Sequence, residues 1–177
     1  MLKWVSLSLA AVLLAVGGGG AYVYVHLNGN IKSTALLPGG VTQAPEIPNK
    51  FGQSPMNILL LGNAGRINAE DCKLGGACGD TVGTADTMMV AHLAADRSNM
   101  TVMSIPRDSI VQLPACAHNE KTLINASLAA GPGCAVQAVH DVTGLTIDHF
   151  IEIDMSGVVT MSEALGGVPV CVTHNVY

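Results

Sequence analysis

An arginine and an aspartate follow directly after an apolar run near the middle of the chain. In residues 104–109 (SIPRDS), Pro106 ends a candidate strand and presents the next two side chains together. The guanidinium of Arg107 could grip phosphate oxygens, and Asp108 could orient the phosphate or serve as a base. The alternative is an ion pair that only ties the loop down. The local sequence favours neither interpretation.

Two weaker motifs also place polar groups at the ends of candidate strands. Asp86, in residues 84–89 (TADTMM), could hold Mg²⁺ against a diphosphate. The glycine turn of residues 62–66 (GNAGR) could bring backbone N–H groups to a phosphate, with Arg66 forking onto its oxygens. For each motif alone, a capped turn or a surface arginine is the better explanation. No Walker A lysine follows the turn.

Lys121 stands at the start of a predicted helix, where the helix dipole disfavours a cation. A phosphate ligand would account for this position, although a solvated lysine is the commoner case. Four histidines, His118, His140, His149 and His174, have no metal-ligand spacing and are interpreted as structural.

The five cysteines indicate an oxidising compartment. Cys72 and Cys78 bracket a glycine-rich loop and could close a small ring, and Cys116 and Cys134 flank a candidate helix across which they could pair. Sequence does not fix this connectivity, and the absence of a C-x2-C pair disfavours zinc. Cys171 is left over, so we expect the chain to be truncated at its C-terminus and the partner of Cys171 to lie beyond it.

The elements that must position these groups mix strands with helices. Apolar runs predict strands over residues 56–61, 87–93, 100–105, 149–153 and 168–172, with a hairpin turn at 94–99. Helices are predicted over 121–130, 134–142 and 155–165, the last capped by Asp154. Residues 62–85 are expected to form a long loop. The mixture predicts an α/β or α+β class with a mixed sheet.

The first 27 residues are predicted to be a transmembrane anchor. From Trp4 to Leu27 the chain has no acidic or basic side chain except His26, and about 20 apolar residues cross a bilayer. A cleaved signal peptide is the alternative, but no small-x-small site precedes the polar part. Residues 28–55, rich in proline and glycine, are expected to be a linker that holds the globular residues 56–177 off the membrane.

Length and charge limit the remaining possibilities. The 177 residues suffice for one small domain and an anchor. The net charge is −5 and no basic run occurs, so binding to nucleic acid is disfavoured.

Taken together, the motifs resemble the LytR–CpsA–Psr family over residues 56–172. The resemblance rests on the order and spacing of residues 56–66 (MNILLLG…R), 85–89 (ADTMM), 104–108 (SIPRD), 121–126 (K..INA), 143–150 (TGL..DHF) and 164–168 (ALGGV). The extra cysteines and the glycine-rich insertion are typical of an actinobacterial version.

The resemblance implies a single-pass cell-membrane protein whose α-β-α layered domain lies outside the cytoplasm. It implies Mg²⁺-assisted transfer of a phosphoglycosyl cell-wall polymer from a polyprenyl-diphosphate carrier to peptidoglycan. By position, Arg66, Arg107 and Lys121 face the diphosphate, and Asp86 binds or orients Mg²⁺. Asp108 orders Arg107 or the acceptor. Positive charge around the diphosphate, rather than a covalent nucleophile, suits this chemistry.

Two departures from the family pattern keep other functions open. Ala64 stands where the family has an aspartate, with Asn63 as a partial substitute, and the family's later arginines are missing. A non-catalytic lipid- or glycan-binding module of the envelope is therefore an alternative. A membrane-linked transcription attenuator is a third, which the acidic charge and outward placement disfavour.

Overall fold

The structure is a computed structural model, and it describes residues 2–29, 31–66, 68–75, 78 and 83–171. The chain divides into two compact units, residues 1–34 and residues 35–177. The first unit consists mainly of one helix, α1 (Leu2–Gly29). Within it, Leu9–Gly29 is long and apolar enough to cross a membrane. The predicted N-terminal apolar helix is therefore present.

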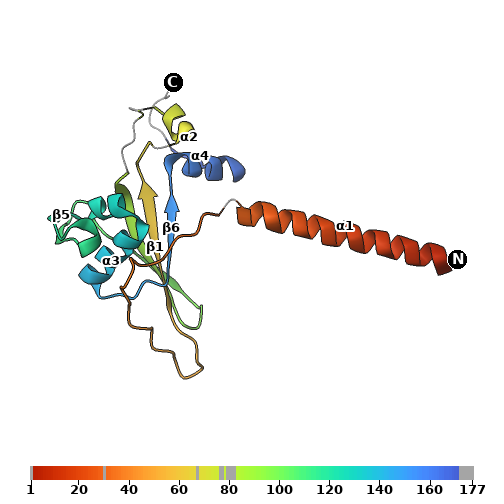
Figure 1. Cartoon of the computed structure of the whole chain (residues 1–177), viewed down its shortest axis with the longest axis horizontal. Helices are drawn as coiled ribbons and strands as arrows, with labels where there is room; N and C mark the ends of the chain where they lie inside the picture. The colour runs from red at the N-terminus through yellow and green to blue at the C-terminus, as the bar shows by residue number, and fades with distance from the viewer. Residues whose placement is uncertain (1, 30, 67, 76–77, 79–82, 172–177) are drawn as a thin grey trace. The chain divides into compact units, whose positions relative to one another are not determined.

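A four-stranded mixed sheet organises the second unit, with the strand order β3-β2-β1-β6. The central strand β1 (Met56–Asn63) pairs antiparallel with β2 (Ala85–Leu93), which pairs antiparallel with β3 (Met100–Ser104). On its other side, β1 pairs in parallel with β6 (His149–Ile153), and Figure 1 shows the two arrows pointing the same way. The predicted mixed sheet and the hairpin between β2 and β3 are confirmed.

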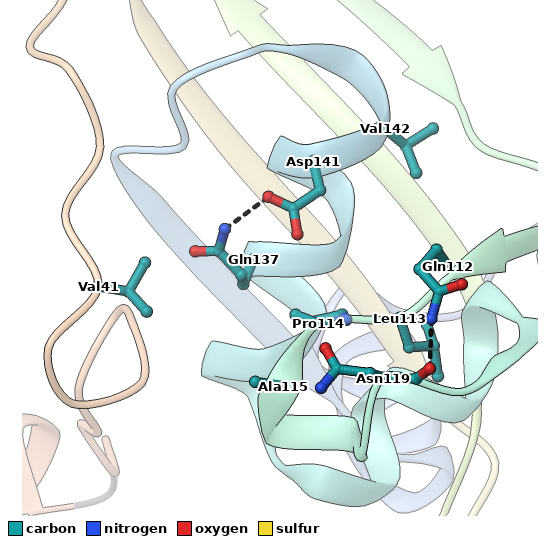
Figure 2. Close-up of a pocket in the computed structure, with 9 residues that line it drawn as sticks. All are labelled: Val41, Gln112, Leu113, Pro114, Ala115, Asn119, Gln137, Asp141 and Val142. Carbon is teal, nitrogen blue, oxygen red and sulfur yellow. Dashed lines mark hydrogen bonds between the residues drawn. The ribbon is translucent and has the colours of Figure 1, made fainter.

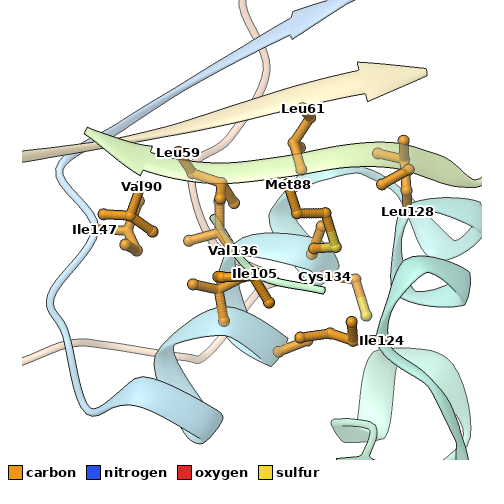
Figure 3. Packing of buried hydrophobic residues seen from close by; sticks show 14 of the residues in the cluster. Leu59, Leu61, Met88, Val90, Ile105, Ile124, Leu128, Cys134, Val136 and Ile147 are labelled. Atoms are coloured by element: carbon orange, nitrogen blue, oxygen red, sulfur yellow. The ribbon is translucent and has the colours of Figure 1, made fainter. Parts of the chain in front are cut away.

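One face of this sheet carries the hydrophobic core. Side chains of β1 alternate between buried and half-buried, as expected for a strand with one covered face. The register places Val90 opposite Leu59 and Met88 opposite Leu61, so all four project to the same side. Helix α3 (Pro132–Thr143) covers them, with Val136 fully buried beneath the strands (Figure 3). Each such side chain contributes about 1.5–3 kcal/mol by leaving water.

The opposite face of the sheet meets helix α4 (Met155–Ala164) only at the end of β6. The side chain of Ile153 lies on this face and touches α4 at Gly157. As predicted, Asp154 caps the helix by accepting a hydrogen bond from the Gly157 N–H at 2.7 Å. Farther along the face, Val102 and Ile151 remain 49% and 47% exposed. The layer order is thus helix, mixed sheet, helix, with the second helical layer covering less.

A small hairpin lies beside the main sheet and corrects one prediction. Strands β4 (Ile110–Gln112) and β5 (Lys121–Leu123) pair antiparallel, with the 3₁₀ helix η1 (Ala115–Ala117) between them. The predicted helix over residues 121–130 is therefore wrong. Its first three residues form β5, and Ile124–Ala130 form a second 3₁₀ helix, η2. The partners of β5 lie nine to thirteen positions earlier, in β4. This pairing is a non-local constraint that local helix propensity does not reveal.

Two further predictions differ from the structure. The expected loop over residues 62–85 contains a short helix, α2 (Ala69–Lys73), which begins at the N-cap residue Asn68. The predicted last strand is wrong for residues 168–171, which form no strand; residue 172 lies outside the described residues. An apolar run needs a hydrogen-bonding partner to become a strand, and no described strand pairs with this one.

Residues 35–46, here called the clasp segment, form the first part of the second unit. Leu36 and Leu37 pack on the hydrophobic core. The side chain of Gln43 accepts a hydrogen bond from the Ile147 N–H at 2.7 Å. Part of the proline- and glycine-rich stretch is therefore integral to the folded unit.

Both predicted disulfides are present. Cys72 pairs with Cys78, beside α2, and Cys116 pairs with Cys134, joining η1 to the start of α3. Cys171 is exposed and free among the described residues.

Candidate functional site

The strand directions bring the predicted site residues to one end of the sheet. Strand β1 ends at Asn63, β2 begins at Ala85, and β3 ends at Ser104, and antiparallel pairing places these three points together. The Ile105 N–H donates to the Met88 carbonyl at 2.8 Å and extends the pairing past β3. Side chains that are far apart in the sequence therefore meet just beyond this edge.

Arg107 and Asp86 form an ion pair at this end of the sheet. The Nε atom of Arg107 also lies 3.6 Å from a carboxylate oxygen of Asp108, so the guanidinium stands between two carboxylates. Arg107 and Asp86 are 47% and 48% exposed. A half-exposed ion pair contributes little stability, about 0–1 kcal/mol. Its geometry instead holds the arginine in a fixed orientation while part of its donor set faces solvent.

The backbone of the Arg107 loop is held by the start of η2. The Arg107 carbonyl accepts a hydrogen bond from the Asn125 N–H at 3.2 Å, and the Ser109 carbonyl accepts one from Ile124 at 2.8 Å. Ile124 is fully buried and Asn125 is 9% exposed. The INA motif therefore positions the arginine loop, a role that the sequence analysis did not assign to it.

The glycine turn after β1 is locked by a buried asparagine. The Asn63 side chain accepts a hydrogen bond from the Gly65 N–H at 2.7 Å and donates one to Glu152 at 2.7 Å. A Cβ atom on Gly83 would lie 1.6 Å from the Asn63 oxygen, so only glycine allows this approach. The Asn63 oxygen thus already accepts one hydrogen bond within the turn, and its partial substitution for the missing aspartate stays a prediction.

Arg66 and Lys121 are not joined to the Arg107–Asp86 pair in the part of the chain that the structure describes. Arg66 lies on the adjacent glycine turn and donates from Nε to the Gly75 carbonyl at 2.5 Å. Lys121 is exposed on β5, opposite Gln112, at the end of the hairpin remote from Arg107. The structure thus groups Arg107, Asp86 and Asp108, places Arg66 nearby along the chain, and leaves Lys121 apart.

A second polar network, absent from the sequence analysis, fixes α2 at the same end of the sheet. Asp71 is fully buried and accepts a hydrogen bond from the Ser156 N–H at 2.7 Å, at the start of α4. The side-chain amide of Asn68 donates to both Asp71 and Asp154. The only sequence signal was the N-x-x-D spacing of a helix N-terminus, in which Asn68 caps Asp71.

The carboxylates do not form a closed metal cage. Among the described residues, no group of three or more His, Cys, Asp or Glu side chains could hold a metal ion. Asp86 bonds to Arg107 through one carboxylate oxygen, and no described residue bonds to the other. Mg²⁺ is commonly held by one or two carboxylates and by substrate phosphates. The residues fit a Mg²⁺ ion only in that open, substrate-assisted form.

The chain is similar to cell-wall proteins of several bacteria. "Probable cell wall biosynthesis protein LcpB" of Corynebacterium glutamicum is 37% identical over 139 residues, 77% of this chain and 32% of that protein. "Polyisoprenyl-teichoic acid--peptidoglycan teichoic acid transferase TagU" of Bacillus cereus is 30% identical over 173 residues, 96% of this chain and 52% of that protein. The crystal structure of Bacillus subtilis TagV is 27% identical with a TM-score of 0.53, covering 65% of this chain and 42% of that chain.

These comparisons agree with the motif pattern. The chain spans from about a third to a half of the length of these relatives. The family model described as the LytR_cpsA_psr family matches residues 23–177, which include the glycine turn, Asp86, the Arg107 loop and the INA motif. With most of its length matched by this model, the chain belongs to the LytR_cpsA_psr family.

Proposed function

We propose that this chain acts in the transfer of a cell-wall glycopolymer from a polyprenyl-diphosphate carrier to peptidoglycan. The observation that carries the proposal is the oriented, half-exposed guanidinium of Arg107 between Asp86 and Asp108 at one end of the sheet. The name of the TagU relative, a polyisoprenyl-teichoic acid–peptidoglycan transferase, supports this substrate class.

The proposed reaction is a displacement at phosphorus. An acceptor hydroxyl of peptidoglycan attacks the phosphorus linked to the polymer, and the bond to the bridging oxygen breaks. Polyprenyl phosphate leaves with that oxygen, and the hydroxyl proton passes to a carboxylate, for which Asp108 is exposed and adjacent. Arg107 stabilises the charge on the departing phosphate, and Arg66 supports the same diphosphate from the neighbouring turn.

Asp86 has two roles in this proposal. It orients Arg107 through one carboxylate oxygen, and its other oxygen is available to Mg²⁺. Bound Mg²⁺ would neutralise part of the diphosphate charge. Lys121 stays a prediction, because its exposed position on β5 requires a substrate that extends along the hairpin.

The same proposal places the globular unit outside the cytoplasm, anchored by α1. The apolar segment Leu9–Gly29 and the two disulfides support this placement, since disulfides persist in oxidising compartments.

The experiment measures release of polyprenyl phosphate from a short-chain polyprenyl-diphosphate saccharide by the full chain in detergent, with Mg²⁺ and with a peptidoglycan fragment as the hydroxyl acceptor. We expect Arg107→Gln to lower the rate by about a hundredfold or more, since charge stabilisation at a transferred phosphate is lost. The matched control is Arg97→Gln in the β2–β3 turn, at the opposite end of the sheet. Equal rates for both variants and the wild type would refute the assignment of Arg107.

A non-catalytic envelope module is the second candidate. It is favoured by Ala64, which stands where the family has an aspartate, so that one expected metal ligand is missing. The same assay separates the two candidates. Saturable binding of the lipid diphosphate without any release of polyprenyl phosphate would support the binding module and contradict the transferase.

A further inference from the structure

A second site lies on the helical side of the sheet, away from the Arg107 loop. A cavity of about 540 Å³ is bounded by the clasp segment at Val41, by β4 and the turn after it, and by helix α3. Figure 2 shows Gln137 and Asp141 on α3 facing Gln112 and Asn119 across the cavity. None of Arg66, Arg107 and Lys121 lines it. The cavity is therefore distinct from the diphosphate site proposed above.

The lining of this cavity excludes a phosphate. Among the described residues that line it, Asp141 carries the one charged side chain, a carboxylate. No lysine, arginine or histidine is among them. A carboxylate repels an anionic ligand, and nothing on the walls compensates for that repulsion. The ligand must therefore be neutral or cationic.

The polar groups of the cavity offer both hydrogen-bond donors and acceptors. The Gln137 amide donates to one carboxylate oxygen of Asp141 at 2.6 Å, and the Gln112 amide donates to the Asn119 carbonyl. Each contact uses one of the two N–H groups of an amide, which leaves the second N–H and the side-chain oxygens for a ligand. The Oε1 atom of Gln137 is buried without a partner and points toward Val41 in Figure 2.

Apolar walls stand between these oxygens, contributed by Val41, Leu113 and Val142. A ligand with hydroxyl and acetamido donors around apolar C–H faces matches such a surface, as pockets of this size combine apolar walls with a few fixed polar groups. We propose that this cavity binds N-acetylated sugar units of the acceptor glycan. This inference rests on the proposed function, which supplies peptidoglycan as the acceptor.

The hairpin connects this cavity to the proposed reaction site. Gln112 pairs with Lys121 at one end, and the backbone of Arg107 bonds to Asn125 at the other. Arg107 and Gln112 are five positions apart, which at about 3.3 Å per extended residue is at most ~17 Å. A glycan bound in the cavity could therefore extend along β4 and β5 and present a hydroxyl near Arg107.

The test measures binding of chitotetraose, an N-acetylglucosamine tetrasaccharide, to the full chain in detergent by isothermal titration calorimetry. We expect saturable binding that weakens about tenfold or more in the double variant Gln112→Ala/Asp141→Ala. Val41→Trp should weaken it similarly by filling the cavity while keeping every polar partner. Glu163→Ala, an exposed carboxylate on α4, is the control and should bind as the wild type does. The melting temperature of each variant shows whether it is folded.

Three results would overturn the proposal: no saturable binding by the wild type, equal binding by Val41→Trp, or tighter binding of a peptidoglycan stem peptide than of the tetrasaccharide. The last would assign the cavity to a peptide amine. Release of polyprenyl phosphate is measured in parallel. If release occurs without glycan binding, the cavity proposal alone fails; if glycan binds without release, the proposed reaction alone fails.

Discussion

At the scale of single residues, the site depends on an arginine whose carboxylate partners orient it. Arg107, Asp86 and Asp108 are all about half exposed or more, so their pairing contributes little to folding. Substitutions here should therefore change activity much more than stability.

We predict that Asp86→Asn lowers the rate of polyprenyl phosphate release by about tenfold to a hundredfold. The amide keeps the shape but loses the charge that orients Arg107 and would bind Mg²⁺. The same variant should need a higher Mg²⁺ concentration for half-maximal rate. Asp108→Asn should leave that concentration unchanged, because Asp108 acts on the proton. A Mg²⁺ dependence that is unaltered in Asp86→Asn would remove Asp86 from the metal site.

At the buried residue Asn57, a substitution should change stability much more than activity. Asn57 is 1% exposed, and its side chain bonds to Glu46 at 2.9 Å, to the Thr146 carbonyl at 2.7 Å and to His92 at 2.7 Å. We predict that Asn57→Ala lowers the free energy of unfolding by about 2–4 kcal/mol, since it leaves several polar groups without partners. Urea denaturation checks this, with the exposed Asn99→Ala as a control expected to change little. Equal losses in both variants would contradict the buried network.

At the scale of elements, the turn between β2 and β3 contains a carboxyl group whose pKa depends on hydrogen bonds within the turn. The side chain and backbone N–H of Ser98 donate to Asp96, which lowers the pKa of that carboxyl below its ordinary value. We predict that Ser98→Ala raises the pKa of Asp96, as followed by NMR titration of the side-chain carbonyl. Because the folded pKa is the lower one, any stabilisation is present at neutral pH and is lost as pH falls through that pKa. An unchanged pKa in Ser98→Ala would show that the turn contact is not formed.

The disulfide between η1 and α3 closes a larger loop. Cys116 and Cys134 are 18 residues apart, and Cys134 is 2% exposed. We predict that Cys116→Ser lowers the free energy of unfolding by about 3 kcal/mol, as expected from chain entropy for a loop of this length. Denaturant unfolding of the variant and of the wild type, the latter with and without reductant, measures the loss. If reductant destabilises the wild type but the variant unfolds as the oxidised wild type does, the stabilisation comes from a disulfide other than Cys116–Cys134.

Sequence predicted the elements whose signals are local. The apolar run at residues 56–61, the hairpin turn, and the helix after Asp154 each depend on neighbours a few positions away. The helix predicted over 121–130 failed because Lys121–Leu123 pair with Ile110–Gln112, which no local pattern shows. The short helix α2 was missed for the same reason, since its buried Asp71 bonds to Ser156, 85 positions later.

The candidate site was likewise predictable only where its contacts follow from local sequence patterns. The proximity of Asp86 and Arg107, 21 positions apart, follows from the β2–β3 hairpin. The separation of Lys121 from Arg107 follows from the β4–β5 register, which the sequence did not reveal. The hydrogen-bonded orientation of the Asn63 side chain depends on the close approach of Gly83, which is a tertiary contact.

At the scale of the whole molecule, the second unit extends beyond the predicted domain boundary at residue 56. The contact boundary lies between residues 34 and 35, and the clasp segment contributes to the core and to the wall of the cavity. The stretch that proline and glycine content marked as linker is thus partly a structural element.

The clasp segment leads to a prediction on truncation. A variant that begins at residue 35 keeps Leu36, Leu37, Gln43 and Glu46 and should unfold as the globular part of the full chain does. A variant that begins at residue 48 loses two partly buried leucines and three hydrogen bonds, so we expect its free energy of unfolding to fall by about 3–5 kcal/mol. Urea denaturation of the two variants, followed by circular dichroism, measures the difference. If both unfold at the same urea concentration, the clasp segment does not stabilise the domain, and its wall of the cavity would not be fixed in place.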